Sequence, residues 1–272
     1  MAIIAGPCVL ESLDLGMLIG RAVQDACRRH GLTYIFKASF DKANRTSIDS
    51  PRGPGLEPGL AWIRHIGRAL GVPVTTDIHD PAQAEPAAQS VDLLQIPAFL
   101  CRQTDLLIAA GRAAAAHKRA VNVKKGQFLS PDEMAGPVDK LAQAGCRNIM
   151  LTERGTFFGY GRLVNDFLGV AEMAELAVDG AEPAPICFDC THSTQRPGRG
   201  EGGKVTGGNP RMAPMLARAA TAAGVHALFI ECHPEPKKAL SDAATMLPLD
   251  QIPALLREVA VIRSALDAAN DR

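Results

Sequence analysis

The chain has 272 residues, with 29 basic and 29 acidic side chains, so it carries no formal net charge at pH 7. This balance gives no support for a nucleic-acid or membrane-surface partner, and no apolar run reaches the ~18 residues of a membrane span. Residues 1–20 lack the pattern of a signal peptide, so we expect a cytoplasmic protein. Seven cysteines, an odd number, argue against a disulfide framework and leave thiols free to bind a metal.

Short apolar runs recur along the chain, and each ends in polar residues. They are continuous rather than alternating, as expected for strands that are buried on both faces. Eight such runs are predicted to be strands: 2–8, 33–40, 72–78, 93–99, 120–126, 148–155, 184–192 and 227–233.

Helical patterns lie between these runs. Apolar residues spaced by three and four predict a helix from Ser12, a suitable N-cap, to Gly31, and another from Leu255 to Leu266. Strand and helix alternate eight times, which predicts an α/β fold of the (β/α)8 TIM barrel type. No composition shift marks a boundary, so we expect 1–272 to be a single domain. A doubly wound open sheet is the alternative fold.

Every predicted strand ends in groups that do not belong in an apolar core. In a (β/α)8 barrel these ends build the active site, whereas an open sheet would spread them along an edge. Eight separate clusters therefore favour the closed barrel, although any one of them could be solvated loop residues. The residues are Cys8, Glu11, Lys37, Asp41, Lys42, Asp77, His79, Gln95, Lys124, Lys125, Glu153, Arg154, Asp189, His192, Glu231 and His233.

Six cations are predicted to meet at this mouth. Crowded like charges repel, so the set is stable only with anions present. Arginine and lysine both suit phosphate and carboxylate groups, which predicts a substrate with several negative charges. The cations are Lys37, Lys42, Arg45, Lys124, Lys125 and Arg154.

A metal site is a further hypothesis, with Cys8, His192, Glu231 and Asp242 as candidate ligands. A sulfur, nitrogen and oxygen donor set suits a first-row transition ion better than Mg²⁺ or Ca²⁺. From spacing alone a buried core cysteine is the alternative for Cys8. The CxxC of Cys187–Cys190 is interpreted as core, because these positions of a strand face opposite sides. His79 and His233 are interpreted as structural or supporting groups.

The segment 194–210 holds six glycines and two prolines, a composition that excludes regular structure. Because it follows His192 and carries basic residues, we favour a lid that closes over bound anions. A passive loop is the alternative.

Longer motifs carry a resemblance to a known family. They run through almost the whole chain in order, and by them the sequence resembles the 3-deoxy-D-manno-octulosonate 8-phosphate (KDO8P) synthases. The segments include AGPCVLES (5–12), FKASFDKANRTS (36–47), VNVKKGQFLSP (121–131), LTERGTFFGYGRLVNDF (151–167), FDCTHSTQRPG (188–198) and ECHPEPKKALSDAATMLPL (231–249).

The resemblance implies a barrel that forms a homotetramer and condenses phosphoenolpyruvate with D-arabinose 5-phosphate, in lipopolysaccharide (KDO) biosynthesis. Cys8 in Gly-Pro-Cys implies the metal-dependent branch of that family, with one divalent transition metal ion (Zn, Mn, Fe or Co). The other branch has an asparagine there. The implied ligands are the four residues suggested above, and the implied catalytic residues are Lys42, Cys8, His192 and Asp77.

Substrate contacts are implied residue by residue. The phosphoenolpyruvate pocket would be formed by Lys37, Ser39, Lys42, Gln95, the Ala98 backbone, Lys124 and Arg154. Asn44, Arg45 and Thr46 would bind arabinose 5-phosphate, and Arg102 would reach the sugar phosphate of a neighbouring subunit. Asp77 would lie near the sugar hydroxyls or the metal.

Two alternative functions remain open, and three residues differ from the family pattern. The synthase that uses erythrose 4-phosphate to make the seven-carbon product shares the barrel and metal set, but it usually has Lys-Pro-Arg-Thr where this chain has KANRT (42–46). A non-catalytic anion- or metal-binding barrel is an alternative of another class, and would be expected to lack a ligand or anchor. Gly161, Arg162 and Asn165 depart from the family pattern.

Overall fold

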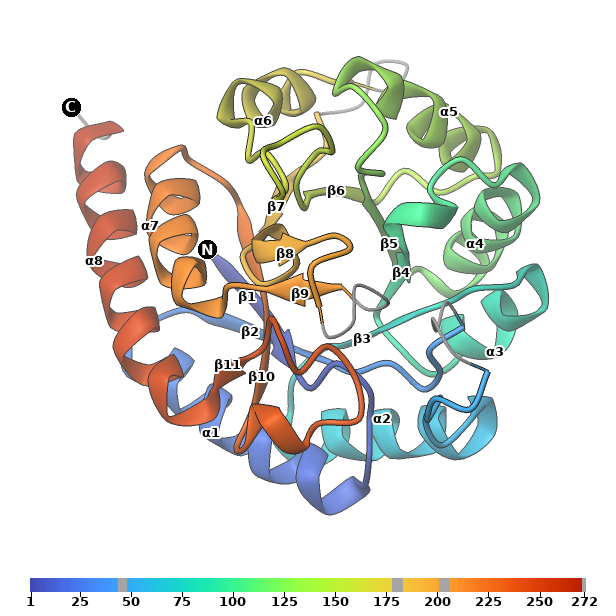
Figure 1. The fold of residues 1–272 in the computed structure, drawn as a ribbon. Helices are drawn as coiled ribbons and strands as arrows, with labels where there is room; N and C mark the ends of the chain where they lie inside the picture. Colours follow the sequence, from blue (N-terminus) through green and yellow to red (C-terminus); the bar gives the residue numbers. More distant parts are fainter. Residues whose placement is uncertain (44–47, 178–182, 201–205, 271–272) are drawn as a thin grey trace.

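Eight parallel strands form a closed barrel in the computed structural model, which describes residues 1–43, 48–177, 183–200 and 206–270. Neighbours in the barrel follow chain order, and β1 pairs with β10 from Ala2↔Ala227 to Gly6↔Glu231, which closes the ring (Figure 1). The strands are β1 (Ala2–Gly6), β2 (Thr33–Lys37), β3 (Val74–Asp77), β4 (Leu93–Ile96), β5 (Ala120–Lys124), β6 (Ile149–Glu153), β7 (Ile186–Asp189) and β10 (Ala227–His233). The predicted (β/α)8 barrel is therefore confirmed, and the open-sheet alternative is wrong.

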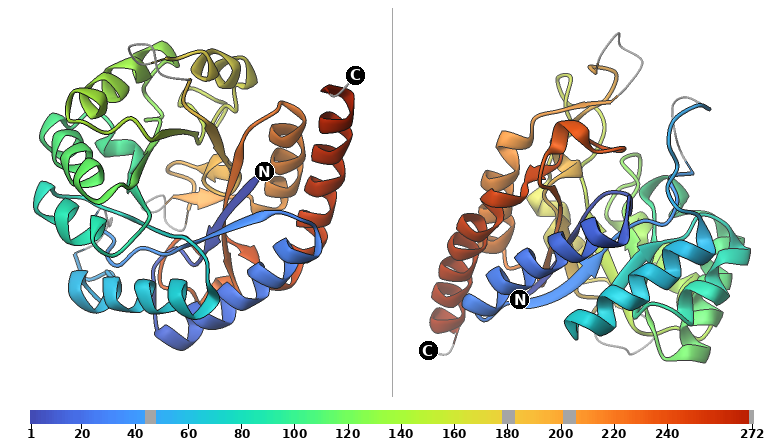
Figure 2. Two further views of the ribbon diagram at one scale, coloured as in Figure 1. Left: turned by 180° about the vertical axis from the view of Figure 1, so that it is seen from behind. Right: turned by 90° about the horizontal axis from the view of Figure 1, so that it is seen from below.

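Helices surround the strands as an outer ring (Figures 1 and 2). The side-chain oxygen of Ser12 accepts a hydrogen bond from the Leu15 amide at 3.1 Å, so the predicted N-cap is confirmed. The α-helices are α1 (Leu13–Arg29), α2 (Leu56–Leu70), α3 (Ala84–Ala88), α4 (Thr104–His117), α5 (Ala135–Gln143), α6 (Phe167–Ala174), α7 (Ala213–Ala222) and α8 (Ile252–Asn270). Short 3-10 helices occupy Pro81–Gln83, Ala98–Leu100, Asp132–Met134, His192–Thr194, Pro210–Met212, Pro236–Lys238 and Leu249–Gln251.

Three short strands lie outside the barrel ring. β8 (Gln195–Arg196) and β9 (Gly207–Gly208) form an antiparallel hairpin over the middle of the barrel (Figure 1), and β11 (Leu247–Pro248) pairs in parallel with the end of β10. The expectation of no regular structure in 194–210 is wrong for these residues. The glycines allow the hairpin, because a Cβ on Gly207 would lie 2.8 Å from the carbonyl oxygen of Arg199.

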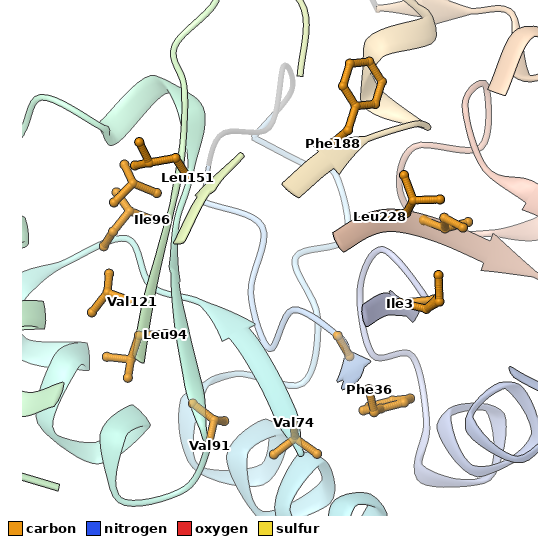
Figure 3. Packing of buried hydrophobic residues seen from close by; sticks show 14 of the residues in the cluster. Ile3, Phe36, Val74, Val91, Leu94, Ile96, Val121, Leu151, Phe188 and Leu228 are labelled. Carbon is orange, nitrogen blue, oxygen red and sulfur yellow. The ribbon is translucent and has the colours of Figure 1, made fainter. Parts of the chain in front are cut away.

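The hydrophobic core has two parts. Outward-facing strand residues such as Ile3, Phe36, Val74 and Leu228 pack against the helices (Figure 3). A smaller cluster of Ile4, Leu93, Cys187, Ala227 and Phe229 fills the inside of the barrel. Cys187 belongs to the inner cluster and Cys190 to the outer one, so the interpretation of this CxxC as core is confirmed. All seven cysteines lie in the described part of the chain and are free.

Polarity rises along the inside of the barrel toward the carboxyl ends of the strands. Above the inner apolar cluster, Asn122 donates to the Gln95 side chain at 3.3 Å and accepts from the Thr152 hydroxyl at 2.6 Å. The inward positions that follow are charged, such as Lys124 and Glu231. Buried charge requires partners, so this end of the barrel is where a site is expected. No helix among the described residues is long and apolar enough to span a membrane.

Candidate active site

One cavity of about 810 Å³ opens at the carboxyl ends of the strands. Because the strands are parallel and the ring is closed, residues from successive strands face the same space. The predicted convergence of strand ends is therefore confirmed. The lining includes Lys37, Lys42, Asp77, His79, Gln95, Ala98, Lys124, Arg154, His192, Glu231 and Asp242.

Four candidate metal ligands lie together at one side of this cavity. The buried Cys8 thiol donates to Oδ2 of Asp242 at 3.0 Å, and potential ligand atoms of Cys8, Glu231 and Asp242 all lie within 4.8 Å of one another. Nε2 of His192 lies 3.4 Å from Oδ2 of Asp242 and 3.6 Å from Oε2 of Glu231. The closed barrel thus brings together residues that are far apart in sequence.

The chemistry of this donor set fits a divalent transition ion. Nδ1 of His192 lies 2.7 Å from Oδ2 of Asp189, which orients the ring and turns Nε2 toward the cluster. Oε2 of Glu231 is buried and has no hydrogen-bond partner among the described residues. A bound cation would satisfy this oxygen, and a thiolate, an imidazole and two carboxylates suit such an ion.

Charges within the cluster shift its pKa values. Burial raises the pKa of the Cys8 thiol well above its usual value, and the Asp242 and Glu231 carboxylates raise it further. Burial opposes the charged form of His192, but Asp189 and Glu231 outweigh this effect and raise its pKa. Burial is the main cause of the shift at Cys8, and the nearby Lys42 and Lys37 partly oppose the two carboxylates.

Buried cations among the described residues face the same cavity, and they include Lys37, Lys124 and Arg154. Nζ of Lys37 lies 2.5 Å from Oε1 of Glu231 and donates to the Cys8 carbonyl oxygen at 2.9 Å. Nζ of Lys124 lies 2.6 Å from Oδ2 of Asp189 and 3.4 Å from the centre of the Phe229 ring, a cation–π contact from the barrel interior. Such cations are already desolvated and are suited to bind an anion.

Arg154 is only partly paired. Its Nη2 donates to Oε1 of Gln195 at 2.7 Å, whereas its buried Nη1 has no partner within the described part of the chain. Burial lowers the pKa of Arg154, against the attraction of Asp189 and Asp242, but a guanidinium remains charged at neutral pH. Arg154 therefore offers a donor to an anion in the cavity.

A second polar chain connects Lys42 with Asp77. Nζ of Lys42 donates to the Ser39 hydroxyl at 2.8 Å, and this hydroxyl donates to Oδ1 of Asp77. His79 Nε2 lies 3.1 Å from Oδ2 of Asp77.

The charges of this chain shift the pKa values of Lys42 and Asp77. Burial opposes the charge of Lys42, but Cys8, Asp77 and further carboxylates raise its pKa well above the usual value. Burial likewise opposes the charge of Asp77, but Lys42 and His79 hold its pKa well below the usual value. Lys42 therefore carries a proton at neutral pH.

Some predicted residues are not brought to the cavity. The expectation that Lys125 belongs to the mouth is wrong, because side chains alternate along a strand and Lys124 already faces inward. Lys125 instead lies 3.3 Å from Oε2 of Glu153 behind the strands, with both side chains buried. Arg102 is exposed and does not line the cavity. Asn44, Arg45 and Thr46 lie outside the described residues.

Gln195 was not anticipated from the sequence. It begins the β8–β9 hairpin, lines the cavity and accepts the hydrogen bond from Arg154. Its backbone oxygen also accepts from the Leu163 amide at 3.4 Å, which connects the hairpin to the segment after β6. A glutamine in a glycine-rich segment carries no signal of such a role, so sequence reasoning had no means to find it.

The fold and the cavity define a (β/α)8 barrel with a candidate site for anionic ligands beside a cluster of potential metal ligands. A model of the DAHP synthetase I family matches residues 1–267, so the chain belongs to this family.

Individual relatives are similar over nearly the whole chain, and the three described next are each named 2-dehydro-3-deoxyphosphooctonate aldolase. The protein from Nitratidesulfovibrio vulgaris (strain DP4) is 53% identical over 262 residues, 96% of this chain and 92% of the relative. The protein from Cyanothece sp. (strain PCC 7425) is 51% identical over 265 residues, 97% and 93% of the two chains. The protein from Granulibacter bethesdensis is 49% identical over 257 residues, 94% and 87% of the two chains.

Proposed function

We propose that this chain condenses phosphoenolpyruvate with D-arabinose 5-phosphate and water, giving 3-deoxy-D-manno-octulosonate 8-phosphate and inorganic phosphate. The observation that carries the proposal is a shared cavity in which buried Lys37, Lys124 and Arg154 face the cluster around Cys8. This arrangement suits a small substrate with several negative charges. Relatives at about half identity over nearly the full length, with names that specify an eight-carbon phosphorylated acid, support the choice of acceptor.

Phosphoenolpyruvate is anchored by the buried cations in this proposal. Lys37, Lys124 and Arg154 bind its phosphate and carboxylate, with Gln95 and the Ala98 backbone at the wall of the cavity. Fixing both charged ends presents one face of the carbon–carbon double bond to the acceptor, which lowers the entropic part of the barrier. Asn44, Arg45 and Thr46 bind the sugar phosphate, as the family resemblance implies.

The reaction then joins two carbon atoms. C3 of phosphoenolpyruvate attacks the aldehyde carbon, water adds at C2, and the resulting hemiketal phosphate loses phosphate by cleavage of its C–O bond. Lys42 is protonated and is held by Ser39 near Asp77, so it supplies the proton to the developing alkoxide. Asp77 orients Lys42 and faces the sugar hydroxyls.

The metal-dependent branch of the family is part of the proposal. Cys8, His192, Glu231 and Asp242 would hold one divalent transition ion, and Zn, Mn, Fe and Co all suit this donor set. When bound, the ion supplies Lewis-acid chemistry that activates water or orients the substrates. The unsatisfied Oε2 of Glu231 and the 3.0 Å contact of Cys8 with Asp242 support this assignment.

A homotetramer is also proposed. Large apolar side chains are exposed, among them Phe158 at 94% and Tyr160 at 99%, which supports burial against a further subunit. Phe99 is exposed as well and lies three residues before Arg102 in the same segment. In a tetramer Arg102 would reach the sugar phosphate in the neighbouring subunit.

The test measures release of phosphate from phosphoenolpyruvate, with arabinose 5-phosphate or erythrose 4-phosphate as the acceptor. We expect release with the five-carbon sugar and little with the four-carbon sugar. Release only with erythrose 4-phosphate would identify the seven-carbon synthase instead. Release with neither sugar would favour a non-catalytic anion- or metal-binding barrel. That alternative predicts a missing ligand or anchor, and none is missing among the expected residues that the structure describes.

A further inference from the structure

Asp242 is positioned differently from the other three candidate ligands. Glu231 lies within β10, Cys8 comes two residues after β1, and His192 begins the 3-10 helix that follows β7. The hydrogen-bonded ladder of the barrel fixes Glu231 directly. Cys8 and His192 lie just beyond their strands, where the Cys8 carbonyl oxygen accepts from the Ser39 amide at 3.1 Å and the His192 amide donates to Oδ1 of Asp189 at 2.8 Å. Asp242 lies in the segment 234–246 between β10 and β11, where no ladder sets the direction of its side chain.

The turn at Asp242 is itself well defined. Its φ of 49° is in the left-handed region, which residues other than glycine seldom adopt. The Asp242 carbonyl oxygen accepts from the Thr245 amide at 2.9 Å and the Met246 amide at 3.2 Å. These bonds fix the shape of the turn, but they do not fix where the turn lies relative to Cys8.

Glu11 connects this segment to the residues around the cluster. Its Oε1 accepts from the Leu240 amide at 3.0 Å, two positions before Asp242, and Glu11 itself follows Cys8 by three positions. Nε2 of His233, two positions after Glu231, lies 3.7 Å from the same oxygen. Glu11 thus contacts the chain close to three of the four candidate ligands.

Gly208 contacts the segment 234–246 from the β8–β9 hairpin. A Cβ at this position would lie 2.3 Å from the Ala244 carbonyl oxygen and 2.5 Å from Cγ2 of Thr245. A non-bonded Cβ does not approach another heavy atom this closely, so glycine permits this packing where any other residue would require the neighbouring backbone to shift. The φ of Gly208 is not among the positive values, so a substitution there would act by steric contact alone. Figure 1 shows the hairpin beside the segment that joins β10 to β11.

We propose that Glu11 and Gly208 are positioning residues that hold the Asp242 carboxylate toward Cys8 and His192. Through Asp242 they set the affinity of the four-residue cluster for a divalent transition ion. This inference rests on the metal site of the proposed function. It goes further than that site because it assigns a role to two residues that would not touch the ion.

Co²⁺ binding to the metal-free protein provides the test, since its visible spectrum reports the ligands. We expect Glu11→Ala and Gly208→Ala each to weaken Co²⁺ binding about 10- to 100-fold. The thiolate-to-cobalt absorption of Cys8 should persist while the ligand-field bands shift toward those of Asp242→Ala. Persistence of the thiolate band also shows that the variant is folded.

Two control variants separate positioning from a general structural effect. Glu11→Gln keeps an acceptor oxygen for the Leu240 amide and should bind Co²⁺ within about threefold of wild type. Gly136→Ala should have no effect, because Gly136 has an ordinary φ and a Cβ there would meet nothing within 4 Å. In an Asp242→Ala background, Glu11→Ala should cause no further loss of affinity.

Three outcomes overturn the inference. The first is wild-type affinity for Co²⁺ in both Glu11→Ala and Gly208→Ala. The second is a further loss of Co²⁺ affinity when Glu11→Ala is added to Asp242→Ala. Both of these leave the metal site of the proposed function intact. Failure of the wild-type protein to bind Co²⁺ would overturn the metal site together with the inference.

Discussion

The thiol of Cys8 lies 3.0 Å from Oδ2 of Asp242, although 234 positions separate the two residues. Their contact depends on closure of the barrel, because β1 pairs with β10 and the segment after β10 returns over the end of β1. The two ends of the chain therefore contribute jointly to one cluster. This relationship makes the proposed metal site directly testable.

Replacing Cys8 should separate the metal from the rest of the mechanism. Cys8→Ala should lower kcat at least ~100-fold, because a ligand of the proposed ion is lost, and a chelator should silence the wild-type enzyme reversibly. Steady-state phosphate release measures both effects. Cys27→Ala is the matched control, since Cys27 is buried in α1 and does not line the cavity. Full wild-type activity in chelator would exclude a required metal.

Cys8→Asn should behave differently from Cys8→Ala. The family resemblance implies an asparagine at this position in the metal-independent branch, to which this chain is not assigned, so this variant should retain some activity that chelator does not remove. Activity in the presence of chelator is the measurement. If Cys8→Asn and Cys8→Ala are equally inactive, asparagine alone does not convert this site to metal-independent chemistry.

Gln195→Ala should weaken binding of phosphoenolpyruvate. The substitution removes the acceptor for Nη2 of Arg154, and a hydrogen bond to a charged group contributes about 1.5–3 kcal/mol. We expect KM for phosphoenolpyruvate to rise roughly 10-fold or more with kcat changed little. Gln143→Ala, an exposed position at the end of α5, is the control. An unchanged KM would show that Gln195 does not position Arg154.

The Asp77 carboxylate should contribute to the dependence of stability on pH. Its folded-state pKa is held well below the usual value, chiefly by Lys42 and His79 against the effect of burial. Its stabilisation is therefore complete above the unfolded-state pKa of about 3.9 and is lost as pH falls toward the folded-state pKa. Between pH 7 and pH 3, wild type should lose about 1 kcal/mol more unfolding free energy than Asp77→Asn. Denaturant unfolding at both pH values measures this difference, and equal losses would contradict it.

The ion pair behind the cavity should contribute to stability. Glu153→Gln leaves Lys125 buried without its carboxylate partner, which should destabilise the protein by about 3–5 kcal/mol. Glu258→Gln breaks the exposed pair with Arg218 and should cost less than about 1 kcal/mol. Denaturant unfolding compares the two variants. Similarly small losses of unfolding free energy in both variants would show that the buried pair of Lys125 and Glu153 is not needed for stability.

Some of this architecture could be predicted from periodicity alone. The sequence predicts a strand at 227–233, the bounds that β10 has, and Ser12 as the N-cap of α1. The prediction for Lys125 is wrong because adjacent lysines at a strand end look alike in sequence, whereas the pleat sends one inward and the other outward. The β8–β9 hairpin is not predicted because glycine-rich segments carry no periodicity.

Local patterns are enough to predict that strands alternate with helices and that each strand ends in polar residues. Other contacts appear once the chain is folded: the cluster of Cys8, His192, Glu231 and Asp242, the contact of Arg154 with Gln195, and the contact of Glu11 with the backbone before Asp242. These contacts join segments distant along the chain, so local periodicity carries no information about them. They depend on the closure of the ring and on how the segments after the strands pack over its mouth.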